Sequence, residues 1–239
     1  MNNFKTEITI PSLGDIVHAN IRLDKALNEL SANSIELISM RDLAYARIFD
    51  AKEHYGKDNS LLCNDGSYLK EGSLFIPGSD KKRILLSNSL LLSNATLAVK
   101  AHSNDTEYFP EDFNYEEYLD KLNPSDYYIL DNNDLRPQGI PANRLSEFGS
   151  MRWLLKDQVK DYEYMIVAGS FDSEKFTIHL HMNNSDDQYI ESQSKPFTNQ
   201  LADDGIYAYG AFYGDARRID KPFRVRGLKR ESVNDKLTK

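Results

Sequence analysis

Several residue types are scarce in this chain of 239 residues, and each scarcity excludes a class of protein. The single cysteine, Cys63, excludes an intrachain disulfide and a cluster of thiolate metal ligands. No apolar run is long enough to span a bilayer, because polar residues interrupt the longest candidate, 84–99. The first residues also lack the basic start and the apolar run of a signal peptide. We therefore expect a cytoplasmic protein that does not contact a membrane.

Motifs with a catalytic spacing are missing as well. The glycines at 205, 210 and 214 have neither the spacing nor the following helix of a phosphate-binding loop. Asp172, Glu174 and Lys175 could serve a metal-dependent nuclease, but they fall at a predicted turn and not in a buried strand that would tune them. We therefore expect a protein that is not an enzyme and that needs no cofactor.

Positive charge, although scarce in the chain as a whole, gathers at its carboxyl end. Residues 216–239 contain nine Lys or Arg and three acids, a net charge of +6. Because the whole chain carries −8, residues 1–215 carry −14. Like charges collected in one segment do not stabilise a fold, so such a segment usually contacts a polyanion. The residues that we expect to hold phosphates are Arg217, Arg218, Lys221, Arg224, Arg226, Lys229 and Arg230.

An aromatic segment directly precedes the basic one. If residues 206–213 form a strand, its alternation places Tyr207, Tyr209 and Tyr213 on one face. A row of tyrosines can stack unpaired bases, each stacked base contributing about 1–3 kcal/mol. The same tyrosines could be half-buried strand residues, because aromatic residues favour strands.

A short strand is also predicted at residues 223–225. There, Arg224 and Arg226 share one face, ~7 Å apart, while Phe223 and Val225 face inward. This spacing is close to that of adjacent phosphates in a single strand. We expect that changing both arginines to glutamate abolishes RNA binding and leaves the melting temperature almost unchanged. A solvated terminal edge remains the other interpretation of these two residues.

The order of the predicted elements indicates the fold class. Helical periodicity is found in residues 24–30, 34–55 and 143–160. Strand patterns are found in 4–10, in two strands within 84–101 that join near Ser93, and in 164–169, 175–182, 206–213 and 223–225. Strands that follow one another, rather than alternating with helices, favour an α+β fold with a mainly antiparallel sheet. We expect a ferredoxin- or RRM-like core with helices on one face, which would leave the other face free for a ligand.

Residues 103–142 differ in character from the rest of the chain. They contain ten acids, two bases and four of the eight prolines. This composition predicts an acidic, loop-rich insertion with one short helix near residues 115–122. We expect a single domain over residues 1–239, with this insertion and with 216–239 as a basic carboxyl-terminal segment.

The segment Gly205-Ile-Tyr-Ala-Tyr-Gly-Ala-Phe-Tyr-Gly214, followed by Arg217 and Arg218, resembles part of the RRM-derived (RAMP-type) RNA-binding subunits of CRISPR effector complexes. The resemblance is architectural and involves about half of the chain. It implies a crRNA-binding backbone subunit of an antiviral ribonucleoprotein, which assembles with copies of itself and other subunits and cleaves nothing. The predicted function is therefore binding of single-stranded nucleic acid, with RNA as the favoured ligand.

Two other functions remain open. The acidic insertion could imitate a phosphate backbone, which would make this an interaction or inhibitor protein. Alternatively, His179 and His181 lie on the same side of a predicted strand, with Asp186 and Asp187 nearby, and could hold Zn²⁺ or Mn²⁺ in a metal-dependent hydrolase. Binding that weakens steeply with salt would indicate the nucleic-acid function.

Overall fold

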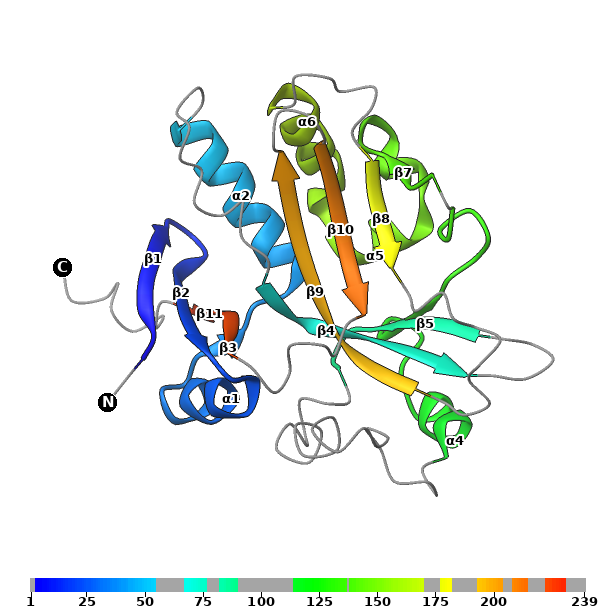
Figure 1. Ribbon diagram of the computed structural model, residues 1–239, viewed down its shortest axis with the longest axis horizontal. Coiled ribbons are helices and arrows are strands. Elements are labelled where there is room, and N and C mark those ends of the chain that lie inside the picture. Colours follow the sequence, from blue (N-terminus) through cyan, green and yellow to red (C-terminus); the bar gives the residue numbers. More distant parts are fainter. Residues whose placement is uncertain are drawn as a thin grey trace.

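The fold consists of a large sheet with helices packed against it (Figure 1). A computed structural model describes residues 3–54, 67–76, 82–89, 114–136, 138–169, 177–181, 193–203, 208–214 and 222–230. All statements about structure below concern these residues.

The sheet contains eleven strands. They are β1 (Lys5–Ile10), β2 (Gly14–Ile21), β3 (Glu36–Leu37), β4 (Ser67–Ile76), β5 (Lys82–Leu86), β6 (Tyr127–Ile129), β7 (Ile140–Pro141), β8 (Thr177–His181), β9 (Gln193–Asp203), β10 (Ala208–Gly214) and β11 (Phe223–Lys229). Their order is β1-β2-β11-β4-β9-β10-β8-β7; β3 pairs with β11, and β5 pairs with β4 and β6. Among these strands, β10 runs parallel to β8 and β11 runs parallel to β4, whereas the other ladders are antiparallel.

The described residues form five α-helices and two 3₁₀ helices. They are α1 (Leu23–Ala32), α2 (Met40–His54), α4 (Tyr115–Asp120), α5 (Gly149–Leu155) and α6 (Val159–Gly169), with the 3₁₀ helices η2 (Ala142–Glu147) and η3 (Lys156–Gln158). None of these helices combines the length and the apolar character that a membrane crossing requires.

Different helices cover the two faces of the sheet. On one face, which we call the α2 face, α2, α5 and α6 bury a large apolar cluster with Leu69 of β4 and Ile178 of β8. On the opposite face, the α1 face, α1 packs against Tyr68 of β4 and Val225 of β11. Tyr68 and Leu69 are neighbours in one strand, and neighbouring side chains point to opposite faces, so the two clusters lie on opposite sides.

Helix α4 covers another part of the α1 face. Its residues Tyr118 and Leu119 pack on Ile84 and Leu86 of β5. These two strand residues alternate with Leu85, which belongs to the cluster on the α2 face. The helix predicted near residues 115–122 is thereby confirmed.

The predicted fold class is confirmed only in part. The fold is α+β with a mixed, mainly antiparallel sheet. The expectation that helices cover one face is wrong, because α1 and α4 lie opposite α2, α5 and α6. The ferredoxin- or RRM-like core is also wrong: the chain begins with the hairpin β1–β2, and the last strand, β11, inserts between β2 and β4.

Helix α2 begins six residues after the predicted start at Ser34. Glu36 and Leu37 pair instead with β11, which holds them in a strand. The hydroxyl of Ser39 accepts a hydrogen bond from the Asp42 amide (3.1 Å) and donates to the Asp42 carboxylate (2.8 Å). Ser39 is therefore the N-cap residue of α2, because its side chain accepts from an amide of the first turn.

The predicted helix over 143–160 and the predicted strand over 164–169 are also corrected. The chain forms η2, α5, η3 and α6 in succession, and α6 continues to Gly169. Tyr162 and Ile166, which are buried, are four residues apart and lie on one helical stripe. The strand predicted over 164–169 is therefore wrong, because these residues belong to α6.

Candidate functional site

The structure divides the ten residues that the sequence predicts to bind nucleic acid. Those outside the described residues are Tyr207, Arg217, Arg218 and Lys221. Tyr209 and Tyr213 lie in β10, for which the backbone is described but not the side chains. Arg224, Arg226 and Lys229 lie in β11, and Arg230 directly follows it.

Arg226 is a buried structural residue. Its side chain is 0% exposed, and its guanidinium donates from Nε (2.7 Å) and Nη2 (2.9 Å) to the two carboxylate oxygens of Glu7 in β1. The Glu7 side chain is also buried, with 4% exposed. This two-pronged geometry is the strongest that an arginine and a carboxylate can form. Arg226 therefore joins β11 to β1 across β2 and has no exposed surface to offer a phosphate.

Arg224 and His18 complete a group around the same carboxylate, which we call the strand cluster: Glu7, His18, Arg224 and Arg226. Arg224 Nη1 lies 3.4 Å from Glu7 Oε1, and the ladder places His18 opposite Arg226. Burial acts to raise the pKa of Glu7, but the hydrogen bond and charge of Arg226 outweigh it, and the pKa is lowered. Burial lowers the pKa of His18 despite the attraction of Glu7. The cluster is thus organised to keep one carboxylate ionised.

These contacts correct one prediction and confirm another. Arg224 and Arg226 do share a face, and Val225 is buried on the other. The expectation that both arginines are exposed is wrong for Arg226. Replacing both with glutamate would place three carboxylates together in a largely buried site, so we expect that double variant to lose its fold and not only its binding.

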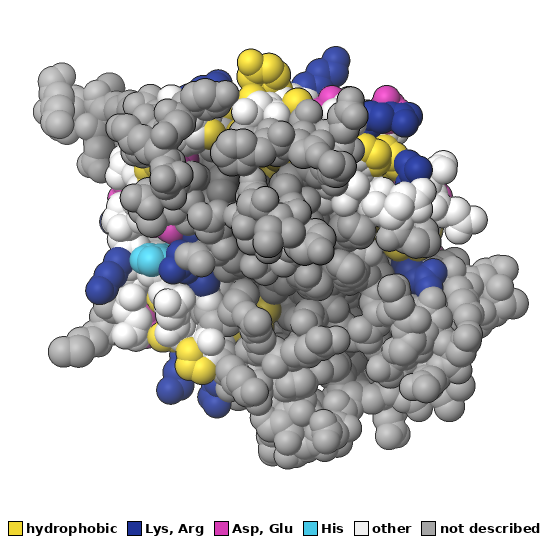
Figure 2. Space-filling view, turned by 45° about the horizontal axis from the view of Figure 1, so that its top comes forward, with side chains coloured by type: hydrophobic (Ala, Val, Ile, Leu, Met, Phe, Trp, Pro, Cys, Tyr) yellow, Lys and Arg dark blue, Asp and Glu magenta, His cyan; other side chains and the backbone are white. Residues whose placement is uncertain are grey.

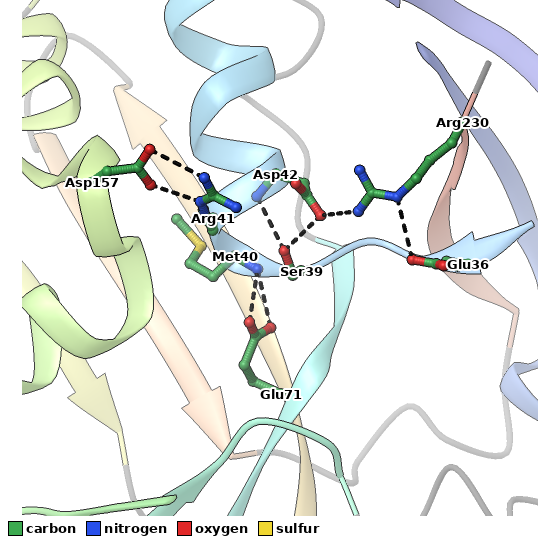
Figure 3. A network of polar contacts seen from close by, with 8 residues as sticks. All are labelled: Glu36, Ser39, Met40, Arg41, Asp42, Glu71, Asp157 and Arg230. Atoms are coloured by element: carbon green, nitrogen blue, oxygen red, sulfur yellow. Dashed lines mark hydrogen bonds and ion pairs between the residues drawn. The ribbon is translucent and has the colours of Figure 1, made fainter. Parts of the chain in front are cut away.

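Arg230 belongs to a second network, at the amino-terminal end of α2 (Figure 3). Its Nε lies 3.7 Å from Glu36 Oε2, and its Nη2 lies 3.4 Å from Asp42 Oδ2. The side chain is 53% exposed, so the pairs are partly screened by solvent. Arg230 therefore ties the end of β11 to β3 and to the first turn of α2.

On the face drawn in Figure 2, the described basic residues do not form one continuous patch. In the view of Figure 2, the Lys and Arg side chains of the described residues occur in several separate groups around the outline. Lys229 is exposed and takes part in no ion pair within the described part of the chain. Its ladder partner in β2 is Asp15, and the binding of phosphate by Lys229 stays a prediction.

The tyrosine strand and the basic strand are not neighbours. Strands β4 and β9 lie between β11 and β10 in the sheet. Three strand spacings of about 4.8 Å therefore separate the two strands by ~14 Å. The chain order of 206–213 and 223–225 gave no sign of this separation.

The register also places the two sets on opposite faces. Tyr213 pairs with Thr198 of β9, and Thr198 pairs with Tyr68 of the α1 face. Paired residues share a face, so alternate positions of β10 from Tyr209 to Tyr213 belong to the α1 face. Arg224 and Arg226 alternate with Val225 of that face and therefore belong to the α2 face. The predicted composite surface, with tyrosines beside arginines, is not formed by Arg224 and Arg226.

A part of the α1 face carries no described helix. We call it the β8–β10 face and define it by alternate positions of β8 from Thr177 to His181, of β9 from Thr198 to Ala202, and of β10 from Tyr209 to Tyr213. In Figure 1, these strands lie in front of α5 and α6, whereas α1 and α4 lie at other parts of the sheet. Tyr209, Tyr213, His179 and His181 all occupy positions of this face.

No group of three His, Cys, Asp or Glu side chains among the described residues could hold a metal ion. The side chains of His179 and His181 are not described, and Asp172, Glu174, Asp186 and Asp187 lie outside the described residues. Metal binding by the two histidines stays a prediction, and so does the nuclease alternative.

Two buried acidic residues that hold the fold together, Glu7 and Asp134, were not identified from the sequence. Glu7 falls within the strand pattern of residues 4–10 and was given no role, although it forms the ion pairs of Arg224 and Arg226. Asp134, within the acidic segment, is buried and accepts a hydrogen bond (3.1 Å) from the amide of Ser150 in the first turn of α5. An unpaired charge on a strand that otherwise reads as half-buried was the available signal for Glu7.

Comparisons with known proteins identify the architecture. No family model matches the chain, and no curated protein matches its sequence. A solved structure described as "Accommodation of massive sequence variation in Nanoarchaeota by the C-type lectin fold" matches with a TM-score of 0.56 at 13% identity, over 92% of this chain and 100% of that chain. At this identity the likeness shows the fold alone. The resemblance to RRM-derived CRISPR subunits is therefore wrong, and the chain has a C-type lectin-like α+β fold.

Proposed function

We propose that this chain is a non-enzymatic recognition protein that binds another protein through the β8–β10 face. The observation that carries the proposal is the uneven cover of the sheet. Helices α1 and α4 cover the β2–β11 and β4–β5 parts of the α1 face, and α2, α5 and α6 cover the opposite face. The β8–β10 face lacks such a helix among the described residues and lies on strands held rigidly from behind.

Composition supports a protein as the ligand. Tyrosine occupies two positions of the face, and tyrosine is enriched where proteins recognise one another. The large negative charge of residues 1–215 repels a polyanion and suits a partner with a basic surface. The structure that this chain resembles is described as a fold that accommodates massive sequence variation. A scaffold of that kind can present different side chains on unchanged strands, as recognition requires.

Binding of single-stranded RNA is the second candidate. Its specific support is the segregated charge of residues 216–239 and the tyrosine positions of β10. With Arg226 buried and Arg224 and Arg230 in ion pairs, the exposed phosphate contacts would fall to Lys229 and to Arg217, Arg218 and Lys221, outside the described residues. A cytoplasmic location, assembly with copies of itself and the inhibitor role of the acidic segment remain predictions.

Site-specific photo-crosslinking tests both candidates at once. A benzophenone amino acid at Gln200, a central position of the β8–β10 face, should form a protease-sensitive adduct in cells that express the chain. The matched control is the same probe at Glu116, an exposed position of α4. A nuclease-sensitive adduct at Gln200 would favour RNA over protein. Equal yields at the two positions would contradict the proposed face.

A further inference from the structure

Glu71 is a buried carboxyl group that has no part in the proposed function. It lies in β4, where the register with β9 shifts between Tyr68 and Gly72. In this interval the chain turns to other partners: Lys70 N donates to Ile38 O (2.9 Å), and Ser89 N donates to Lys70 O (2.8 Å). Irregularities of this kind re-aim a side chain. Here the shift accompanies a Glu71 side chain that reaches the start of α2.

The carboxyl group binds the first amide of that helix. Met40 N donates to both Glu71 oxygens, at 3.1 and 3.0 Å (Figure 3). Residue Glu71 is 7% exposed and Met40 is 0% exposed, so water has little access to the contact. A helix start presents unpaired N–H groups that favour a negative acceptor. The ionised and protonated forms of Glu71 therefore bind Met40 with different strength.

Charged groups surround Glu71 without forming an ion pair to it in the described part of the chain. Asp42 faces it from α2, Lys70 from β4 and Lys156 from η3. Arg41 is held by Asp157 (2.7 Å), and Asp42 is held by Arg230. The contrast with Glu7 is direct: Glu7 is buried against an arginine, whereas Glu71 is buried against an amide and a neighbouring carboxylate.

Burial raises the pKa of Glu71 to about 7, and the charge of Asp42 adds to that rise. The amides of Glu71 and Met40, and then Lys70, act in the opposite direction and only reduce it. The proton is thus exchanged in a pH range where few other carboxyl groups titrate.

We propose that the junction of β4 with the first turn of α2 is a proton-responsive element, in which the proton on Glu71 sets how firmly β4 holds the start of the helix. The same turn carries Asp42, which binds Arg230 beyond β11, and Ile38 N donates to Arg226 O (3.1 Å). These two contacts connect the start of α2 to β11 and to Arg230 beyond it. The partner chemistry is a proton alone, and the inference does not depend on the proposed function.

The direction of the effect on folding follows from linkage. The folded chain holds the Glu71 proton more tightly than the unfolded chain, whose glutamates titrate near their ordinary value. The contribution of Glu71 to the free energy of unfolding is then greatest below that ordinary pKa value. It falls as pH rises toward 7 and stays at the lower level above pH 7. The contribution of Glu71 to the folding equilibrium constant should fall by about two orders of magnitude across this range.

The test is a pH titration followed at the Met40 amide by two-dimensional ¹H–¹⁵N NMR. In the unmodified protein, the Met40 signal should shift with a midpoint near pH 7, and in Glu71→Gln this transition should vanish. Asp42→Asn removes a like charge and should move the midpoint to lower pH. Glu116→Gln, at an exposed carboxyl group of α4, is the matched control and should leave the Met40 titration unchanged.

Urea unfolding gives a second readout. The folding equilibrium constant of the unmodified protein should fall relative to that of Glu71→Gln between pH 5 and pH 8. A Met40 midpoint near pH 4.5, or an unchanged transition in Glu71→Gln, would overturn the proposal. Should Glu71→Gln not fold, the midpoint and its displacement by Asp42→Asn decide the question without that variant.

Discussion

The two ends of the sheet differ in how their polar side chains and faces are covered. In β1, β2 and β11, charged side chains are drawn inward: Arg226 is fully buried on Glu7, and Arg224 shares the same carboxylate. In β8, β9 and β10, the face opposite the large core lies without a described helix over it. A basic segment in a sequence is therefore not equivalent to a basic surface. Arg226 serves the fold, and the surface that we propose for recognition is the β8–β10 face, at the other end of the sheet.

Breaking the Glu7–Arg226 pair is the strongest challenge to this comparison. Arg226→Ala should lower the free energy of unfolding by about 3–5 kcal/mol, because it leaves Glu7 buried without its partner. Urea unfolding at pH 7 measures the loss. Lys229→Ala, at an exposed position of the same strand, is the control and should change stability by about 0.5 kcal/mol or less.

The double variant Glu7→Gln with Arg226→Gln sharpens the result. It removes both charges together, so it should be more stable than Arg226→Ala alone. If Arg226→Ala were instead as stable as the unmodified protein and failed to bind RNA, the arginine would belong to a ligand site after all.

A smaller effect is expected at the other end of the sheet. Tyr213→Ala should reduce the crosslinking yield of a probe at Gln200 by about thirtyfold, since truncating an aromatic contact residue commonly costs about 2 kcal/mol of binding. The melting temperature should change little. Tyr164→Ala removes an exposed tyrosine of α6 (76% exposed) and should leave the yield unaltered. A fold that collapses in Tyr213→Ala would assign Tyr213 to the core and remove it from the face.

The smallest effect should come from Arg230, the exposed arginine after β11 that pairs with Asp42 in the first turn of α2. Arg230→Gln should lower the free energy of unfolding by about 1 kcal/mol or less, and less still at high salt, because its side chain is half exposed. Arg41→Gln, which breaks a comparably exposed pair with Asp157, is the matched control. A loss of several kcal/mol in Arg230→Gln alone would show that the end of β11 is held as firmly as Arg226.

Local patterns in the sequence predicted several elements correctly. The helix α1 follows from Leu23, Ala26 and Leu30, which recur at helical spacing and are buried together. The strand β1 follows from the alternation up to Ile10. In both cases a single element carries its own periodicity, so neighbouring residues suffice to recognise it.

Other elements depend on partners that are distant in the chain. Residues 164–167 contain strand-forming side chains, yet they continue α6, because Tyr162 and Ile166 pack into the large core. Glu36 and Leu37 would extend the helical stripe of α2, but pairing with β11 makes them a strand. The partner of Arg226 lies 219 residues away along the chain, which no local pattern could reveal.

The sequence by itself determined the α+β class, the separation of charge along the chain, and the alternation that puts Arg224 and Arg226 on one side of a strand. Only the tertiary structure decided which side that is, what it meets, and which strands stand between the tyrosines and the arginines. The physical reason is that alternation specifies two faces but not their surroundings. Whether a charged side chain is buried, and which partner it meets, is decided when strands from distant parts of the chain pair.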